Sequence, residues 1–455
     1  MRLAALAAVL CGTACHLQAA QHSKPTTIQS CHYDVELSAA GLAHVNASCQ
    51  ADGPITFRLS SGFLASSVHG PSKLLQQRFQ SPDKQLTYDV DLAHLASGVR
   101  DFDRAAHLGQ SFVAPISNVL LVPEPLTTEI PVTVKVTAPP PLAVAVGLAR
   151  DQAPDTYKLM AHEIPVATYF AFGKLQQRTL DIDGSRIDVS ELDGKLDQSF
   201  DDVCAWIKTS ASAVRDFYRV FPVPRASVIV MPIPERDGVV FGKVLPESEP
   251  GVALLLGQHA THKSLYSDWI LVHELYHLGF PSFFEEGKWL DEGLATYYEP
   301  IIRVRAGLYS ETELWDEMQS SMQQGLPAFA ESGLENAHDF RGIYWGGAIA
   351  CLVADVEARK RKLDQGLEVG LRALREAGGN ACEVWTLAEV VGAVNHALGA
   401  ATLAPIVEQH AKRGTPFDLQ ALFANLGVNR DAQGAVQLSD SAPLAQIRRA
   451  ITAKP

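Results

Sequence analysis

Two histidines and a glutamate within one short run are the residues of this sequence best suited to chemistry. His273 and His277 stand four positions apart, and Glu274 directly follows the first of them. On a helix, both imidazole rings project from the same face, with Cβ atoms roughly 5–6 Å apart. Two rings so placed can bind one zinc ion at about 2.0–2.1 Å each, and Glu274 can reach a water molecule that the zinc activates. The spacing therefore predicts zinc-dependent hydrolysis with Glu274 as general base.

The residues on both sides of this run are apolar. Trp269 to Val272 precede it, and Leu278 to Phe280 follow it. Two histidines and a glutamate in so hydrophobic a helix need partners, because an unpaired buried polar group costs roughly 1–3 kcal/mol. A metal ion supplies such a partner. The alternative is a chance match on a soluble helix, in which the histidines are ordinary polar side chains.

A catalytic zinc site also needs a third protein ligand and an open position for water. The extended pattern HExxHxxGxxH is not followed, because Phe280 and Phe283 stand where that pattern requires glycine and histidine. The candidates are therefore the acids further along the chain, which are Glu285, Glu286, Asp291, Glu292 and Glu299.

Placement separates these acids. Glu285 and Glu286 fall in a predicted turn and are better explained as solvated charges. Glu292 lies at the start of a helix predicted over 290–306, which can pack against the first helix and present a first-turn carboxylate to the metal. Its alternative role is that of an acid favoured by the helix dipole. Asp291 and Glu299 are candidates for orienting the histidines from behind.

Longer motifs resemble a known group of enzymes. HELYH at 273–277, followed by WLDEGLATYY at 289–298, resembles the gluzincin peptidases, which use HExxH and then a glutamate inside a WLxEG-like motif. The nearest likeness is to the glycyl aminopeptidase family, with the aminopeptidase N and leukotriene A4 hydrolase family further away. RVRAGL at 303–308 and YWGGA at 344–348 are also similar to the glycyl aminopeptidase pattern, so the likeness covers about residues 200–360.

The resemblance implies a thermolysin-like zincin domain that holds one zinc ion per chain and acts on a peptide or protein. It implies His273, His277 and Glu292 as zinc ligands and Glu274 as the base. It also implies that Tyr344 is the phenol that stabilises the oxyanion, a role that spacing alone would not assign to it.

Three departures from these families bear on specificity. Fourteen residues separate His277 from Glu292, fewer than in aminopeptidase N relatives, so the cleft is reshaped. The strand that binds the substrate's free amine in those relatives corresponds here to 249–254, which has no clear acid in place. No strand-rich segment follows Tyr344 to form the PDZ domain that many glycyl aminopeptidase relatives carry. Internal and amino-terminal cleavage both stay open, and so does a catalytically silent protein that binds peptides or proteins on a zinc fold.

The pattern of elements predicts an α+β multidomain chain. Short alternating runs, such as 32–37 and 130–136, predict an N-terminal antiparallel β domain over 21–175. The catalytic domain is expected over 176–310, with helices at 196–220, 267–279 and 290–306 and buried strands at 227–231 and 252–256. A C-terminal all-helical domain is expected over 311–455, with helices near 346–360, 362–376, 384–398, 401–412 and 417–425.

The start of the chain predicts export. Arg2 and the apolar stretch 3–14 are typical of a signal peptide, assigned to residues 1–20, and a buried N-terminal helix is the alternative. Small residues at 12–14 make Cys15 a possible lipid anchor, so the protein is expected to be periplasmic or secreted, free or membrane-anchored. No later stretch offers the roughly 18 apolar residues of a membrane span. The net charge of −13, without a dense Lys/Arg run, argues against a nucleic-acid partner.

Seven cysteines give a further set of predictions. The five that follow the signal show no CxxC spacing, which excludes a cysteine zinc cluster. An oxidising compartment favours disulfides. We expect the pairs Cys31–Cys49 and Cys351–Cys382, with Cys204 free and buried.

Overall fold

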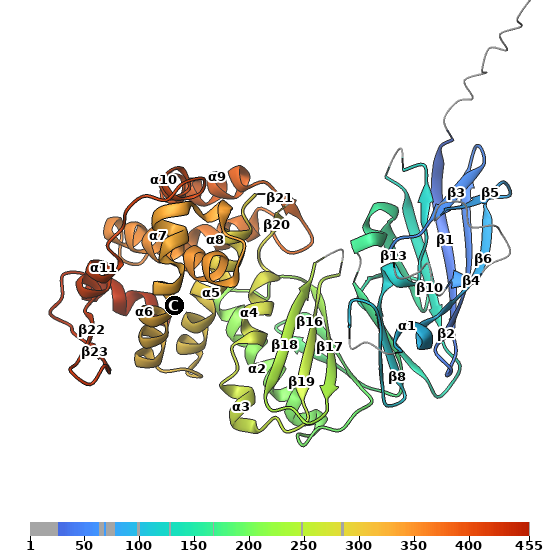
Figure 1. The fold of residues 1–455 in the computed structure, drawn as a ribbon, viewed down its shortest axis with the longest axis horizontal. Helices are drawn as coiled ribbons and strands as arrows, with labels where there is room; N and C mark the ends of the chain where they lie inside the picture. The colour runs from blue at the N-terminus through green and yellow to red at the C-terminus, as the bar shows by residue number, and fades with distance from the viewer. Residues whose placement is uncertain are drawn as a thin grey trace, which may run out of the picture.

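The structure is a computed structural model that describes residues 26–62, 68–69, 78–97, 101–126, 129–166, 168–246, 249–283 and 286–454. The predicted signal peptide at 1–20, the possible lipid anchor at Cys15 and the candidate ligand Glu285 lie outside the described residues. Along the longest axis, a β-rich N-terminal part, a central sheet and a helical C-terminal part follow one another (Figure 1). The predicted α+β class is confirmed at this level.

Three sheets form the N-terminal part in the described residues. The largest has the order β12 (Ala149–Arg150), β13 (Thr156–Met160), β10 (Pro131–Thr137), β1 (Ile28–Leu37), β2 (Leu42–Ala51), β6 (Gln85–Asp91) and β4 (Val68–His69). The second is β5 (Arg78–Ser81), β3 (Ile55–Arg58) and β9 (Val122–Glu124), and the third is β11 (Ala143–Val146), β14 (Tyr169–Gly173), β8 (Ser111–Pro115) and β7 (Ala106–Leu108). The short helix α1 (Leu92–Leu95) and the 3₁₀ turns η2 (Ile116–Asn118) and η3 (Ala161–Val166) connect them.

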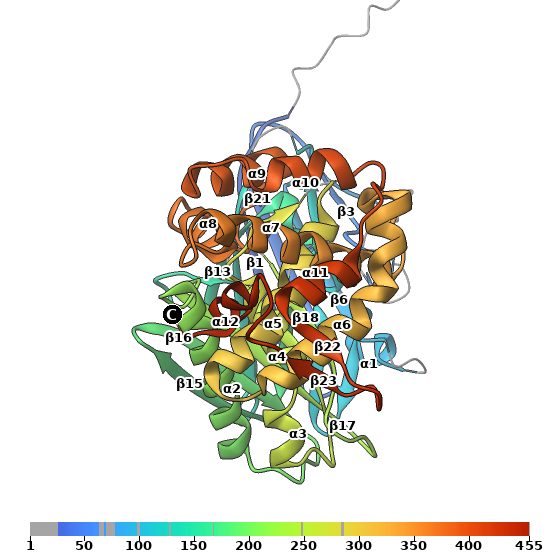
Figure 2. The ribbon, with the colours of Figure 1, turned by 90° about the vertical axis from the view of Figure 1, so that its left-hand side faces the viewer.

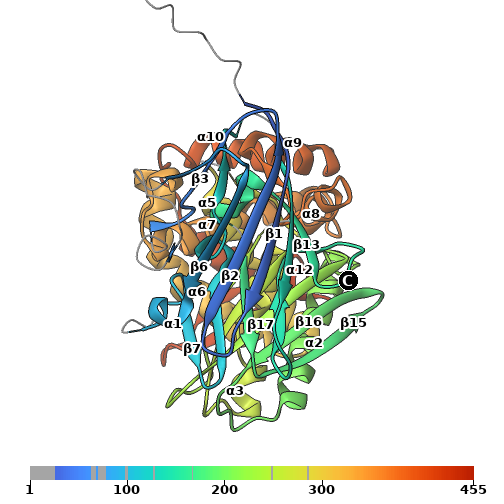
Figure 3. The same ribbon diagram turned by 90° about the vertical axis from the view of Figure 1, so that its right-hand side faces the viewer.

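The strands β1 and β2 run side by side through the middle of the large sheet (Figure 3). Strand β1 pairs antiparallel with β2 but parallel with β10, so the prediction of a wholly antiparallel domain is wrong at this pair. A parallel pair needs a long connection, and the chain between β1 and β10 supplies it by building the other strands first.

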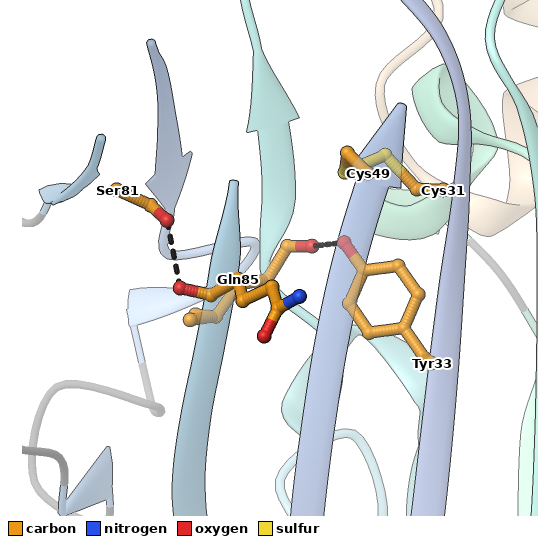
Figure 4. The surroundings of a disulfide bond; sticks show 6 residues. Cys31, Tyr33, Cys49, Ser81 and Gln85 are labelled. Atoms are coloured by element: carbon orange, nitrogen blue, oxygen red, sulfur yellow. Dashed lines mark hydrogen bonds between the residues drawn. A yellow bond between two sulfur atoms is a disulfide. The ribbon is translucent and has the colours of Figure 1, made fainter. Parts of the chain in front are cut away.

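Two of the three cysteine predictions are confirmed. Cys31 on β1 and Cys49 on β2 face each other across the antiparallel pair and form the predicted disulfide (Figure 4). Two residues along β1, the Tyr33 hydroxyl donates to the Leu121 carbonyl at 2.6 Å, which ties the sheet to the loop before β9. Cys204 is buried with a free thiol, as predicted.

The predicted Cys351–Cys382 disulfide is wrong. Cys351 lies buried in the middle of helix α7 (Gly347–Arg361), and its thiol is reduced. Cys382 is exposed in the loop before β21 (Val384–Trp385). A side chain packed inside the core cannot reach a loop on the surface, and the spacing of the two residues carried no information about this.

The central sheet has the order β15 (Leu175–Ile182), β16 (Ser185–Leu192), β17 (Arg225–Ile233), β19 (Gly251–Gly257) and β18 (Val239–Leu245). The inner strands β16, β17 and β19 run parallel, and the edge strands β15 and β18 are antiparallel to their neighbours. On β17, Val228 and Val230 face the helices, whereas Ile229 and Met231 face the β-rich part. Both faces are therefore covered, as the apolar runs of parallel strands require.

Helices cover one face of this sheet and continue into the C-terminal part (Figure 2). They are α2 (Phe200–Tyr218), α3 (His262–Tyr266), α4 (Ile270–His277), α5 (Lys288–Ala306), α6 (Glu311–Pro327), α7, α8 (Leu367–Glu376), α9 (Leu387–Ala397), α10 (Leu403–His410), α11 (Leu419–Leu426) and α12 (Ala445–Thr452). The π-helical segments η4 (Ala328–Ser332) and η6 (Arg341–Gly346) and the 3₁₀ turn η5 (Leu334–Asn336) lie between α6 and α7. One hydrophobic core runs from Leu180 to Ile451.

The expected all-helical C-terminal part also contains short strands. Strand β20 (Ser282–Phe283) pairs with β21, and β22 (Val428–Arg430) pairs with β23 (Val436–Leu438). Among the described residues, no helix combines the length and apolar character that crossing a bilayer requires.

Candidate metal centre

Helix α4 presents three of the predicted site residues. It spans only Ile270–His277 and is apolar except for those residues, so it lies buried, and the Asp268 carboxylate accepts from the Leu271 amide at 2.9 Å at its start. His273 and His277 are 3% and 6% exposed, and their ring centroids lie 4.9 Å apart. One short helix thus holds both imidazoles on one face, as the spacing predicts.

Helix α5 brings Glu292 to the two rings. The helix follows Gly287, whose φ of 108° requires glycine, and Glu292 lies in its second turn. Its Oε2 atom is 3.3 Å from Nε2 of His273 and 3.6 Å from Nε2 of His277. One ligand atom from each of the three residues lies within 4.8 Å of the other two. Two imidazole nitrogens and one carboxylate oxygen are the donor set of catalytic zinc sites, so the residues fit this metal.

A fourth residue orients one of the rings. Nδ1 of His277 donates to Oδ1 of Asp291 at 2.8 Å, which leaves the lone pair of Nε2 directed at Glu292. Burial disfavours a charged ring, but Asp291 and Glu292 outweigh it and raise the pKa of His277 well above its ordinary value. Carboxylates that stabilise a proton on this ring also favour a metal cation beside it. Glu299, the other residue considered for this role, instead accepts from Nη1 of Arg303 at 2.8 Å.

Glu274 points from α4 towards the edge strand β18. Its Oε2 accepts a hydrogen bond from the Val244 amide at 2.6 Å. Gly242 makes this approach possible, since a Cβ at that position would lie 2.8 Å from Cγ of Glu274. Burial raises the pKa of Glu274, opposed by His273 and His277, and a carboxylate with a raised pKa is a stronger proton acceptor.

Tyr344 lies on the π-helical segment η6, where its ring stacks on His273 with centroids 5.8 Å apart. Burial and the nearby Glu292 carboxylate raise its pKa, so the phenol is protonated at neutral pH and can donate. The segments that carry Tyr344 and Glu292 are in close contact. A Cβ on Gly293 of α5 would lie 2.4 Å from the carbonyl carbon of Gly347, the first residue of α7.

Glu274, His277, Glu292 and Tyr344 line one hollow of about 520 Å³. Of the stretch 249–254, which the sequence analysis matched to an amine-binding strand, Ala253 lines this hollow, whereas Glu249 pairs with Arg225 at 3.2 Å outside it. Among the described residues, this stretch therefore places no acid in the hollow, as expected from the sequence.

The edge strand β18 contributes Phe241 to Val244 to the hollow. One of these residues is the cation Lys243. Its Nζ atom lies 2.9 Å from Oδ1 of Asp103 in the β-rich part. Strand β18 was not predicted from the sequence. Gly242 inside an otherwise bulky run is the signal that could have found it, because a glycine in a strand often marks a close approach.

Comparison with known proteins adds evidence at the level of the fold. No protein-family model and no curated protein matches the sequence. An aminopeptidase N family protein from Idiomarina loihiensis superposes with a TM-score of 0.68 at 14% identity, over 90% of this chain and 82% of that one. The M1 zinc metallopeptidase from Deinococcus radiodurans superposes with a TM-score of 0.52 at 13% identity, over 87% of this chain and 96% of that one. The chain has the fold of these M1 zinc metallopeptidases.

The M1-type fold extends over both the β-rich and the helical parts. A two-domain M1 zinc metallopeptidase variant bound to L-arginine superposes with a TM-score of 0.53 at 13% identity, over 87% of this chain and 97% of that one. At such identities the likeness concerns the backbone.

Proposed function

We propose that this protein is an exported zinc metallopeptidase, with His273, His277 and Glu292 as ligands of one zinc ion. The observation that carries the proposal is the convergence of two imidazole nitrogens and a carboxylate oxygen within 4.8 Å of one another. A buried carboxylate and a phenol line the hollow beside them. The M1-type fold supports the proposal, since its members superpose on the parts that carry these residues.

The roles of the side chains follow from their positions. Bound at this site, zinc would supply a Lewis acid that lowers the pKa of water and polarises a peptide carbonyl. Glu274 accepts the proton of the attacking water and returns it to the leaving amine. Its hydrogen bond from the Val244 amide holds the carboxylate in place. Tyr344 donates to the oxyanion of the tetrahedral intermediate, and loss of one such donor commonly costs about 2.7–4 kcal/mol.

The substrate class is a peptide or protein. A related Deinococcus M1 variant has been crystallised with a Tyr-Ser-Ala substrate, and its TM-score with this chain is 0.51 at 12% identity. The hollow of about 520 Å³ is large enough for residues on both sides of a scissile bond.

Export and domain roles complete the proposal. Residues 1–20 direct export, and Cys15 is the attachment point if the mature protein carries a lipid. The Cys31–Cys49 disulfide supports an oxidising compartment. The β domain over 21–175 and the helical domain over 311–455 flank a thermolysin-like catalytic domain over 176–310.

The test compares the purified zinc-loaded protein with its Glu274→Gln variant. We expect one zinc per chain in both by elemental analysis, and hydrolysis of a mixed peptide library that the variant loses by several orders of magnitude. Glu286→Gln is the matched control, because Glu286 is an exposed glutamate outside the hollow that pairs with Lys412. Full activity in Glu274→Gln would overturn the assignment. Zinc and peptide binding without any turnover in the wild type would instead identify the silent binding protein.

A further inference from the structure

A second hollow borders the candidate metal centre. It has a volume of about 210 Å³. His273 and Tyr344 form part of its wall, and Tyr344 also lines the larger hollow described above. Of the proposed metal ligands, His273 borders this hollow, and His277 and Glu292 border the larger one. A peptide whose scissile bond lies at the metal has a side chain on each side of that bond to place in them.

Acidic groups line this second hollow. Glu299 from α5 and Glu317 from α6 both face it. Arg303 is the cation that faces these acids among the described residues, and it is already engaged, with Nη1 on Glu299 and Nη2 on the Ser267 carbonyl at 2.8 Å each. The buried Asp268 carboxylate adds a further acid nearby, which also interacts with Glu299. Three acids thus face one cation. Burial raises the pKa of Glu299 to about 8 and that of Glu317 above its ordinary value, so a cationic ligand that enters the hollow would favour their charged forms.

An unpartnered hydroxyl provides independent evidence for a ligand. Thr296 lines the hollow from α5, one turn beyond Glu292, and is 8% exposed. Its Oγ1 atom is buried and makes no hydrogen bond to any described residue. A buried hydroxyl without a partner is costly, so a polar group that enters the hollow would be stabilised by it.

The walls of the hollow are aromatic. Trp269 from the start of α4 and Phe340 from the start of η6 are 42% and 51% exposed, and Trp345 lies beside them. Large aromatic rings left open to solvent at the rim of a hollow commonly mark a binding site. Aromatic faces attract cations, so the walls favour the same ligand charge as the acids do.

We propose that this hollow is the subsite for a cationic side chain, lysine or arginine, of the substrate residue on one side of the scissile bond. The inference rests on the proposed peptidase function and names its substrate class. The long aliphatic stem packs between Trp269 and Phe340, and the charged head reaches Glu317, Glu299 and the Thr296 hydroxyl. Acidic substrate side chains are repelled here, and aliphatic ones leave the polar groups unpaired.

The experiment uses the full zinc-loaded protein and peptides that differ at one position next to the scissile bond. Arginine is compared with citrulline, and lysine with norleucine, because each pair differs mainly in charge. We expect kcat/KM to be about tenfold or more higher for the cationic member of each pair, at one of the two flanking positions. In Glu317→Gln this ratio should fall several-fold. Asp316→Asn is the matched control, since the exposed Asp316 is the neighbouring residue on α6 but pairs with Arg430 at 2.7 Å.

Further measurements keep the subsite separate from the chemistry. Thr296→Val removes the hydroxyl at nearly constant volume and should lower the same ratio of kcat/KM values. It serves as the second variant in case Glu317→Gln does not fold. Equilibrium binding of the arginine and citrulline peptides to zinc-loaded Glu274→Gln makes the comparison without turnover. Equal values for the two members of each pair, or a ratio unchanged in both variants, would overturn the subsite. If the wild-type protein hydrolyses none of the peptides but Glu274→Gln still binds the arginine peptide more tightly than the citrulline peptide, the result would count against the proposed peptidase function and not against the subsite.

Discussion

Asp291 and His277 form a hydrogen bond of 2.8 Å. It joins the first turn of α5 to the last turn of α4 beside the candidate metal site. Asp291 stands directly before Glu292, so consecutive residues of α5 approach the same ring from its two nitrogens. The Nδ1 contact fixes the tautomer and leaves Nε2 to the metal.

This bond leads to a prediction for zinc affinity. Asp291→Asn keeps the size of the side chain but removes the charge, and we expect zinc binding to weaken by about 10–100-fold. Competition with a chelator of known affinity measures the change. Asp316→Asn removes an exposed charge elsewhere and should leave the affinity within error of the wild type. Unchanged zinc affinity in Asp291→Asn would show that the bond does not support the site.

Tyr344→Phe tests the phenol. The ring can keep its stacking on His273, but the hydroxyl can no longer donate to an oxyanion. We expect kcat to fall by about 10²–10³, with zinc content unchanged. Tyr266→Phe, on helix α3, is the control and should keep its kcat. A loss of zinc in Tyr344→Phe would indicate that the tyrosine acts through the ligands instead.

Gly242→Ala tests the approach of β18 to the base. The added Cβ would lie 2.5 Å from Ile270 and 2.8 Å from Glu274, so the strand or the carboxylate must shift. We expect at least about a tenfold loss of kcat/KM with zinc retained, since small displacements of a catalytic group are costly. Steady-state kinetics and elemental analysis check this. Gly392→Ala is the control, because a Cβ there meets no atom within 4 Å.

Glu191 on β16 provides a pH prediction away from the metal. Burial raises its pKa from 4.5 to about 7, against a hydrogen bond from Gln176 that lowers it. Between these values the folded protein holds a proton that the unfolded chain has released. Stability therefore falls as the pH rises from about 4.5 to about 7, by roughly 3 kcal/mol, and stays level above that range.

Glu191→Gln should remove this loss. The variant is expected to be more stable than the wild type at pH 8 and similar to it at pH 4.5. Urea unfolding of both proteins at the two pH values checks this, because the difference at each pH cancels effects that they share. An equal difference at pH 4.5 and pH 8 would contradict the assignment to Glu191.

Most residues of the candidate metal centre could be predicted from the sequence, because the spacing of residues on one helix face is a local property. His273, Glu274 and His277 lie on one helix face as their positions predict, and Glu292 lies where an amphipathic helix presents its early turns. Buried strands were also located closely, since β17 and β19 contain the apolar runs 227–231 and 252–256.

Long-range pairing was less accessible. Nothing in the spacing shows that β18 turns back to form the sheet edge beside Glu274, or that β1 lies parallel to β10. The failed Cys351–Cys382 pairing has the same origin, because burial of Cys351 depends on helices distant in sequence. Helices α6 and α12 were also missed. Helix α6 starts with a capping box between Ser310 and Glu313, a sequence signal that could have revealed it.

The contact of Gly293 with Gly347 has a consequence for how the centre can move. Backbone meets backbone there, with no side chain between them to change rotamer. A displacement of helix α5 is therefore passed directly to the start of α7. Glu292 directly precedes Gly293 on α5, and Tyr344 lies three residues before Gly347. This contact would resist a change in the spacing between the acid and the phenol, because neither backbone can give way without moving its whole helix.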